Sequence, residues 1–134
     1  LVFHHIWSIN CCDNWKFNEI DKLINDKFLA LRLDDVIELV EINNIMYLEA
    51  NGKYTTFYLL DDIIKVVSKN IGFYEDKLPQ DFFFRIHHKF IVNFKLVSCI
   101  TTSDGNYCIL KNNKSLNISK RKLEPLRRFL NLRQ

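Results

Sequence analysis

The side chains best suited to acid–base or metal chemistry in this chain are histidines, cysteines and two pairs of aspartates. His4, His5, Cys11 and Cys12 form one local cluster. A zinc site needs three or four such ligands at characteristic spacings, and this cluster matches none of those spacings. We therefore expect no metal ion and no cofactor.

A second candidate is the pair His87-His88, which would be a base for a nucleophile if Cys99 or Asp104 lay beside it. Neighbouring residues on a strand point to opposite faces of a sheet. The two histidines are therefore not expected to act together, and the pair is a weak candidate for catalysis.

Two further features also argue against an enzyme. Asp34-Asp35 and Asp61-Asp62 occur where turns are expected, and Asp is favoured in turns because its side chain bonds the nearby backbone. The chain has only 3 glycines, too few for a phosphate-binding loop or a dinucleotide fingerprint. We expect no enzymatic activity.

Charge is distributed unevenly along the chain. Residues 1–62 contain 5 Lys and Arg against 11 Asp and Glu, whereas residues 63–134 contain 14 against 5, so the net charges are −6 and +9. Such a separation is typical of a protein that binds a polyanion, most often a nucleic acid. A solvated face of a terminal helix would explain the basic residues of 111–134 equally well, so charge alone leaves both interpretations open.

The composition indicates a single globular domain. The 134 residues are 48% hydrophobic and 26% charged, close to the averages of folded domains. No run of about 20 apolar residues is present, and the start of the chain lacks a signal-peptide pattern. The 4 cysteines follow no disulfide framework, which favours reduced thiols and a cytoplasmic location.

The hydrophobic pattern predicts a mainly β fold of the α+β class, with about nine or ten short antiparallel strands and two or three short helices. Strands are expected at 28–33, 36–40, 45–50, 54–60, 63–67, 82–86, 90–92, 96–102, 107–110 and 115–118. Residues 1–27 are expected to be an arm or linker with a short helix, because the apolar residues of 15–24 approximate a helical stripe. Residues 28–134 form the expected domain.

Several residues predict local structure. Asn51-Gly52 predicts a type I′ hairpin turn with both residues at positive φ. Ser68 predicts the start of a helix that ends near Leu78, and Ser119 predicts the start of a final helix. Pro125 should interrupt that helix near Glu124. Alternation along the strand that follows the hairpin turn places Thr55, Phe57 and Leu59 on one face and Tyr54, Thr56 and Tyr58 on the other.

Four stretches between Phe28 and about Leu130 resemble, in the same order, the motifs of a known family. They are IMYLEANGKYTTFYL (45–59), VSKN (67–70) leading through Leu78-Pro79, FRIHHKFIVN (84–93) and LNISKR (116–121). The chain resembles the LytTR-type DNA-binding domain, the output domain of bacterial two-component response regulators. This resemblance implies an elongated array of short antiparallel sheets that places loops in successive major grooves of direct-repeat DNA sites and regulates transcription.

The resemblance also implies the roles of individual residues. Thr55, His88 and Arg121 are expected to contact bases. Lys53, Thr56, Lys69, Lys89, Lys120 and Lys122 are expected to contact the DNA backbone or enter the groove. The chemistry of Arg121 suits this role best, because its planar fork can bond the O6 and N7 atoms of guanine. The family often has Ser after the position of His88, whereas this chain has Lys89, so the base preference of that loop stays open.

Two alternatives stay open at this stage. Residues 1–27 are either the linker to a receiver or sensor domain or the arm of a stand-alone regulator, and a homodimer on DNA is compatible with both. The alternative function is a protein–protein interaction or dimerisation module without specific DNA readout, which would use the acidic N-terminal half with Trp7 and Trp15. RNA binding is disfavoured because most aromatic residues fall at core positions of strands.

Overall fold

The computed structural model describes residues 27–132 of the chain. The expected arm at residues 1–27, with its helical stripe and its His and Cys cluster, therefore lies outside the described residues apart from Lys27. Over 27–132, no helix is both long and apolar enough to span a membrane.

The described chain has ten strands in three sheets, and every strand pair is antiparallel. The N-terminal hairpin is β1 (Phe28–Leu33) with β2 (Val36–Glu41). The central sheet has the order β5-β4-β3-β7-β6 and contains β3 (Ile45–Asn51), β4 (Tyr54–Leu59), β5 (Ile64–Val67), β6 (Phe83–His87) and β7 (Phe90–Asn93). The C-terminal sheet has the order β10-β9-β8 and contains β8 (Val97–Thr101), β9 (Tyr107–Leu110) and β10 (Ser115–Asn117).

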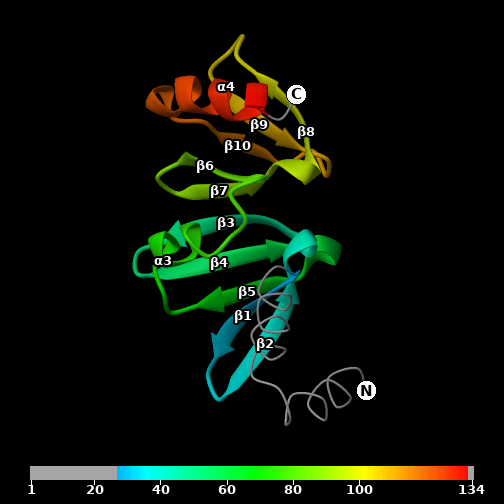
Figure 1. Ribbon diagram of the computed structural model, residues 1–134, viewed down its shortest axis with the longest axis vertical. Helices are drawn as coiled ribbons and strands as arrows, with labels where there is room; N and C mark the ends of the chain where they lie inside the picture. Colours follow the sequence, from blue (N-terminus) through cyan, green and yellow to red (C-terminus); the bar gives the residue numbers. More distant parts are fainter. Residues whose placement is uncertain (1–26, 133–134) are drawn as a thin grey trace, which may run out of the picture.

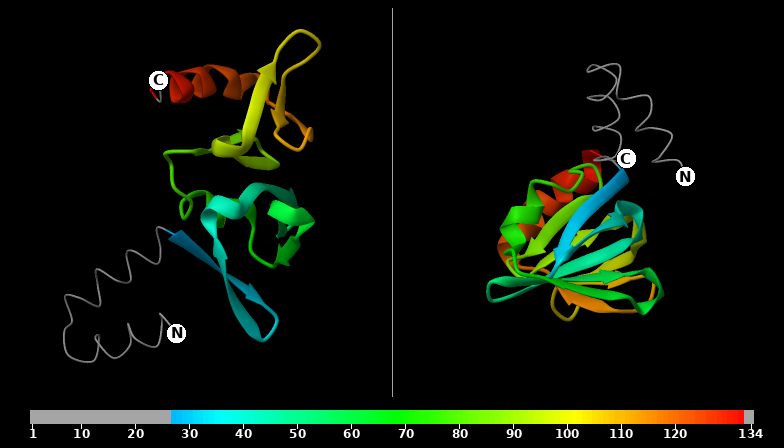
Figure 2. Two further views of the ribbon diagram at one scale, coloured as in Figure 1. Left: turned by 90° about the vertical axis from the view of Figure 1, so that its right-hand side faces the viewer. Right: turned by 90° about the horizontal axis from the view of Figure 1, so that it is seen from below.

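Two α-helices complete the described part, α3 (Ile71–Glu75) and α4 (Leu123–Leu132), together with short 3-10 turns at Ile42–Asn44, Leu60–Asp62, Phe94–Leu96 and Lys120–Lys122. The sheets stack along the long axis of the molecule, with the N-terminal hairpin at one end and the C-terminal sheet with α4 at the other (Figure 1). A view from the side shows the same three tiers (Figure 2). The expected β-rich fold with short antiparallel sheets is confirmed.

The central sheet buries apolar side chains on both faces. On one face, Leu48 and Phe57 pack with the N-terminal hairpin and α3. On the other face, Tyr47 and Val92 pack with the C-terminal sheet and α4. The period of two residues along each strand sends neighbours to opposite faces, so one sheet supports two cores and the fold becomes an elongated stack.

The β3–β4 turn differs from the predicted type. Asn51 pairs with Tyr54, so the two central residues are Gly52 and Lys53. Gly52 has a φ of 61°, while neither neighbour is among the residues with positive φ in the described chain. A positive φ at the first central position alone is the pattern of a type II′ turn. The predicted type I′ turn is therefore wrong, and the turn is centred one residue later in the sequence than predicted.

The helix starts also show where local prediction succeeded and failed. Asn70, not Ser68, caps α3, because its side chain accepts a hydrogen bond from the backbone N–H of Phe73 at 3.0 Å. Ser119 precedes a 3-10 turn over Lys120–Lys122, and α4 begins after it at Leu123. Pro125 therefore falls in the first turn of α4, where a missing N–H costs no hydrogen bond. The helical segment after Ser119 thus changes from a 3-10 turn to an α-helix at Leu123, next to the position where a kink or restart was expected, but Pro125 does not interrupt α4 itself.

Candidate nucleic-acid interface

Strand pairing brings three separate turns to one end of the central sheet. The last residue of β5, Val67, pairs with Thr55 just after the β3–β4 turn. The first residue of β7, Phe90, pairs with Glu49 just before that turn. The backbone N–H of Ala50 also donates to the carbonyl of Lys89 at 2.8 Å. The β3–β4 turn, the β5–α3 junction and the β6–β7 turn are therefore neighbours.

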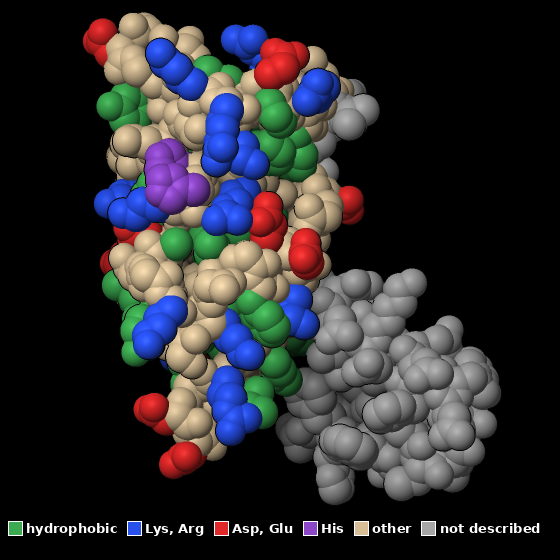
Figure 3. Space-filling view, turned by 90° about the vertical axis from the view of Figure 1, so that its left-hand side faces the viewer, with side chains coloured by type: hydrophobic (Ala, Val, Ile, Leu, Met, Phe, Trp, Pro, Cys, Tyr) green, Lys and Arg blue, Asp and Glu red, His purple; other side chains and the backbone are tan. Residues whose placement is uncertain are grey.

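The start of the C-terminal helix joins the same edge. The backbone N–H of Ser119 donates to the carbonyl of Ile86 at 2.9 Å, which holds the Lys120–Lys122 turn beside the end of β6. Exposed basic or titratable side chains from all four segments form what we call the basic edge: Lys53, Lys69, His88, Lys89, Lys120 and Arg121. Lysine and arginine side chains gather along this face of the molecule beside the histidines (Figure 3).

Thr55, expected to contact a base, is fully buried at 0% exposure. Its Oγ1 donates to the backbone carbonyl of Lys69 at 2.7 Å. A side chain in this position offers no surface to a base, so we assign it no base contact. Its hydroxyl instead ties the β5–α3 junction, and with it Lys69, to the strand that follows Lys53.

Thr56 is also buried, at 6% exposure. Its Oγ1 accepts a hydrogen bond from Nδ2 of Asn51 at 3.0 Å across the hairpin. The bond stiffens the turn that carries Lys53. Thr56 therefore supports the loop from within, while Lys53 is the exposed residue that could meet a phosphate.

Arg85 holds the β6–β7 turn from one side. Its Nη1 donates to Oε1 of Glu75 at 2.9 Å, and its Nη2 donates to the carbonyl of His88 at 2.7 Å. Both bonds involve an ionised group, and such bonds are stronger than those between neutral groups. The turn that presents His88 and Lys89 is thus anchored to α3 through Arg85.

His87 supports the same turn from its other side. Its Nδ1 accepts a hydrogen bond from the backbone N–H of Lys89 at 3.1 Å, and its ring lies 4.3 Å from that of His88 and 5.8 Å from that of Phe90, measured between centroids. Burial, followed by the nearby charges of His88 and Lys89, lowers the pKa of His87. A lower pKa favours the neutral imidazole, which is the form whose Nδ1 can accept this hydrogen bond, whereas His88 faces solvent.

The C-terminal part of the basic edge lies in the turn that precedes α4. Lys120 and Arg121 are exposed, whereas Lys122 is half-buried and lines a small hollow with Glu75 and Arg85. Arg121 precedes α4 in a short 3-10 turn, so its guanidinium is carried on a backbone segment that Ser119 and Ile86 hold in place.

One basic residue near this edge was not assigned a role from sequence. Lys114 is exposed and lines a hollow of about 300 Å³ together with His87, Lys89 and Asn117. The only signal in the sequence was the position of Lys114 in the net positive C-terminal segment, because its proximity to the β6–β7 turn arises only in the folded chain.

Within 27–132, no three His, Cys, Asp or Glu side chains come together as metal ligands. Burial raises the pKa of the Cys108 thiol to about 12, which leaves it protonated and unreactive at neutral pH. Asp104 lies in the β8–β9 turn at the far end of the molecule from the N-terminal hairpin (Figure 1).

Comparisons with known proteins agree with this geometry. Residues 35–131 match the family described as the LytTr DNA-binding domain. Among solved structures, the chain is similar to the LytTr DNA-binding domain of a putative methyl-accepting/DNA response regulator from Bacillus cereus, with 25% sequence identity and a TM-score of 0.67 over 78% of this chain and 96% of that one. A search of curated proteins gave no match. With the family match spanning most of the chain, including every segment of the basic edge, this protein belongs to the LytTR family of DNA-binding domains.

Proposed function

We propose that this chain is the sequence-specific DNA-binding part of a bacterial transcription regulator of the response-regulator type, acting in the cytoplasm on double-stranded sites arranged as direct repeats. The observation that carries the proposal is the basic edge: exposed cations from four turns lie along one face of a rigid β scaffold. Cations on such loops neutralise phosphates and supply most of the affinity for DNA, while a few neighbouring side chains supply specificity.

The exposed residues divide into two roles in this proposal. Arg121 and His88 contact base edges, because an arginine fork and an imidazole can both bond acceptors in the major groove. Lys53, Lys69, Lys89 and Lys120 contact phosphates, with Lys122 as a half-buried neighbour. Thr55, Thr56 and Arg85 position these groups through the hydrogen bonds described above.

The first test is selection of duplexes from a random pool by the full chain, followed by fluorescence anisotropy on the selected duplex at several salt concentrations. We expect one enriched motif, repeated in the same orientation, and a steep loss of affinity with salt. A steep salt dependence without an enriched motif would leave a general polyanion binder. No binding at low salt would overturn the DNA-binding role.

Substitutions sharpen this test. Lys89→Ala should reduce the slope of log affinity against log salt by about one, as expected for one lost phosphate contact. Lys65→Ala is the matched control, because Lys65 pairs with Glu38 at 2.9 Å, outside the basic edge. An equal change in both variants would show that the slope follows net charge and not the basic edge.

The second candidate function is protein–protein interaction. The observation that favours it is the outer face of the N-terminal hairpin, where Ile37 and Leu39 are 63% and 46% exposed. This surface lies on a different sheet from the basic edge, so the two functions are compatible in one molecule.

A further inference from the structure

The N-terminal hairpin has an apolar outer face. Its inner face is buried in the core through Leu31 and Val40. On the outer face, Ile37 pairs with Arg32 and Leu39 pairs with Ala30, and all four side chains are exposed. Antiparallel sheets with one solvated face normally carry polar residues there, so exposed aliphatic side chains at these positions indicate a contact surface.

The tip of the hairpin adds negative charge to this surface. Asp34 and Asp35 form the turn between β1 and β2, and Val36 beside them is 55% exposed. The tip points away from the rest of the molecule along its long axis (Figure 1). A binding partner for this hairpin must therefore offer an apolar surface with a positive charge.

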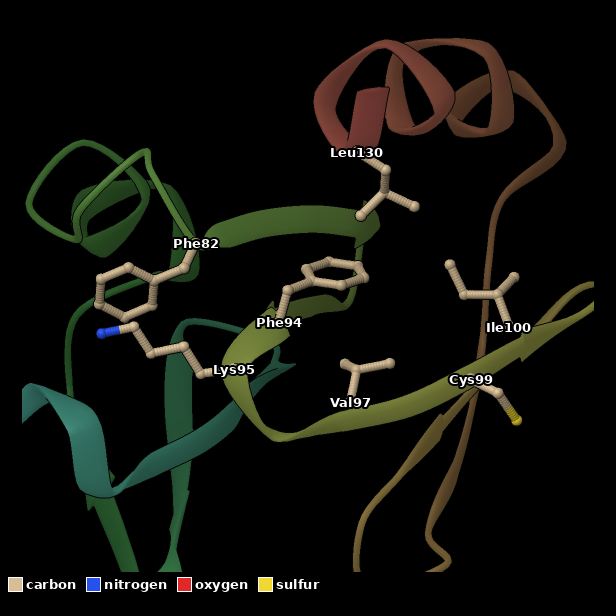
Figure 4. Close-up of a pocket in the computed structure, with 7 residues that line it drawn as sticks. All are labelled: Phe82, Phe94, Lys95, Val97, Cys99, Ile100 and Leu130. Atoms are coloured by element: carbon tan, nitrogen blue, oxygen red, sulfur yellow. The ribbon is translucent and has the colours of Figure 1, made fainter. Parts of the chain in front are cut away.

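A groove with these properties lies in the other half of the molecule. Its volume is about 430 Å³, and its apolar walls include Phe94, Val97, Ile100 and Leu130 from the β7–β8 connection, β8 and α4. Figure 4 shows these side chains pointing into the space between β8 and α4.

Lys95 supplies the positive charge at one end of this groove. Its Nζ lies 4.0 Å from the centre of the Phe82 ring, and it is the one charged residue among the described residues that line the groove. The lysine is exposed, so it is available to an acidic group that approaches along the groove.

We propose that the N-terminal hairpin of one copy of this chain docks in the β8–α4 groove of a second copy. Ile37 would enter the apolar part of the groove together with Leu39, which lies on the same face of the hairpin, and Asp35 would approach Lys95. The distribution of charge supports a second copy as the partner, because the N-terminal half of the chain is acidic and the C-terminal half is basic. Copies of such a rod attract one another when they align head to tail.

This contact joins two different surfaces, so it leaves a free hairpin at one end of the pair and a free groove at the other. Contacts of this kind produce open chains unless a rotation closes them into a ring. Adjacent copies are then related head to tail and not by a two-fold axis, and directly repeated DNA sites also lack such an axis. That last step rests on the proposed function, whereas the self-association does not.

The test is sedimentation velocity of the full chain without DNA, from low micromolar to near-millimolar concentration. We expect reversible association that extends beyond dimers. Ile37→Asp should weaken it by at least about tenfold, because it places a charge in an apolar groove. Ile64→Asp is the control, since Ile64 is 56% exposed but lies on β5 outside the hairpin.

The groove is tested by Lys95→Glu, with Lys77→Glu as its control, because Lys77 makes a similar contact at 4.8 Å with the ring of Phe73. Each of the Ile37→Asp and Lys95→Glu variants should associate much more weakly than the unchanged chain when it is alone. Their mixture should form pairs, since the first variant keeps its groove and the second keeps its hairpin. A chain with both Lys95→Glu and Asp35→Lys should regain association.

A monomer at every concentration would overturn the proposal, and so would association that neither Ile37→Asp nor Lys95→Glu weakens. Association without rescue in the mixture would also overturn it, in favour of another interface. The measurement is independent of DNA binding. If DNA binding holds, Ile37→Asp should bind one site normally and lose cooperativity on a duplex with two sites.

Discussion

Arg85 reaches from β6 to the backbone carbonyl of His88, where its Nη2 donates a hydrogen bond of 2.7 Å. The same guanidinium bonds Glu75 of α3 at 2.9 Å. Its Nε has no hydrogen-bond partner among the described residues, so the side chain is held by its two terminal nitrogens. The orientation of the β6–β7 turn on the basic edge therefore depends on an ion pair with a helix in another part of the sequence.

Replacing Arg85 should affect both stability and DNA binding. Arg85→Ala removes two charge-assisted hydrogen bonds, so we expect the free energy of unfolding to fall by about 1–3 kcal/mol. The affinity for DNA should fall as well, because the His88 turn loses its anchor. Arg85→Lys should retain the charge but not both bonds, and Arg128→Ala on the surface of α4 is the control. Denaturant unfolding and anisotropy on the same samples measure the two effects. Unchanged affinity in Arg85→Ala would remove the turn from the interface.

A substitution of Thr55 distinguishes a role in positioning Lys69 from a direct contact with a DNA base. Thr55→Val keeps the shape of the side chain but removes its hydrogen bond to the Lys69 carbonyl, which should cost about 1–3 kcal/mol of stability. DNA affinity should fall slightly through the displaced Lys69, with the same preferred sequence. Thr102→Val, at an exposed site beyond β8, is the control. A changed base preference in selection experiments would mean that Thr55 reaches a base after all.

Arg121 should contribute specificity. Arg121→Ala is expected to weaken binding to the selected site by about 1–3 kcal/mol and to relax the preference at one base pair. Arg32→Ala, an exposed arginine on the N-terminal hairpin, should leave single-site binding unchanged. Anisotropy with duplexes that vary at each position measures both quantities. A uniform loss of affinity over all sequences would assign Arg121 to a phosphate.

His87 should make folding sensitive to acid. Burial, with smaller contributions from His88 and Lys89, lowers the pKa of His87 below its ordinary value of 6.5. Between the pKa of His87 in the folded chain and its higher pKa in the unfolded chain, the unfolded chain binds more protons than the folded chain. The contribution of neutral His87 to the free energy of unfolding is therefore complete above pH 6.5 and declines as the pH falls. Urea unfolding between pH 7.5 and pH 5.5, values on either side of about 6.5, should show this decline. His87→Gln should reduce it, and an identical decline in the variant would contradict the assignment.

His88 should contribute directly to DNA affinity, because its side chain is exposed on the β6–β7 turn. His88→Ala should weaken binding to the selected site and leave the free energy of unfolding unchanged, with Lys65→Ala outside the basic edge as the control. Anisotropy and urea unfolding on the same samples measure the two effects. Unchanged affinity in His88→Ala would place His88 outside the contact surface.

The sequence predicted the strands well, because the alternation of apolar and polar residues and the presence of turn-forming residues are signals that span only a few positions of the chain. The strands expected at 96–102 and 107–110, for example, correspond to β8 and β9, which pair across the turn that contains Asp104 and Gly105. The prediction of the β3–β4 turn failed because it depends on register. The β3–β4 turn moved by one residue because cross-strand pairing, not local preference alone, decides which two residues occupy the centre of a turn.

The sequence by itself determined which side chains share a face of β4. It placed Thr55, Phe57 and Leu59 on one face, and Phe57 and Leu59 lie together in one core. It also determined the family, through motifs that depend on order and spacing. Only the tertiary structure decided which faces are covered, because burial depends on segments distant in sequence. The Lys69 carbonyl lies 14 residues from Thr55 and accepts its hydroxyl. Such contacts turned an expected base-contacting residue into a support for the basic edge, and left Arg121 and His88 exposed on it.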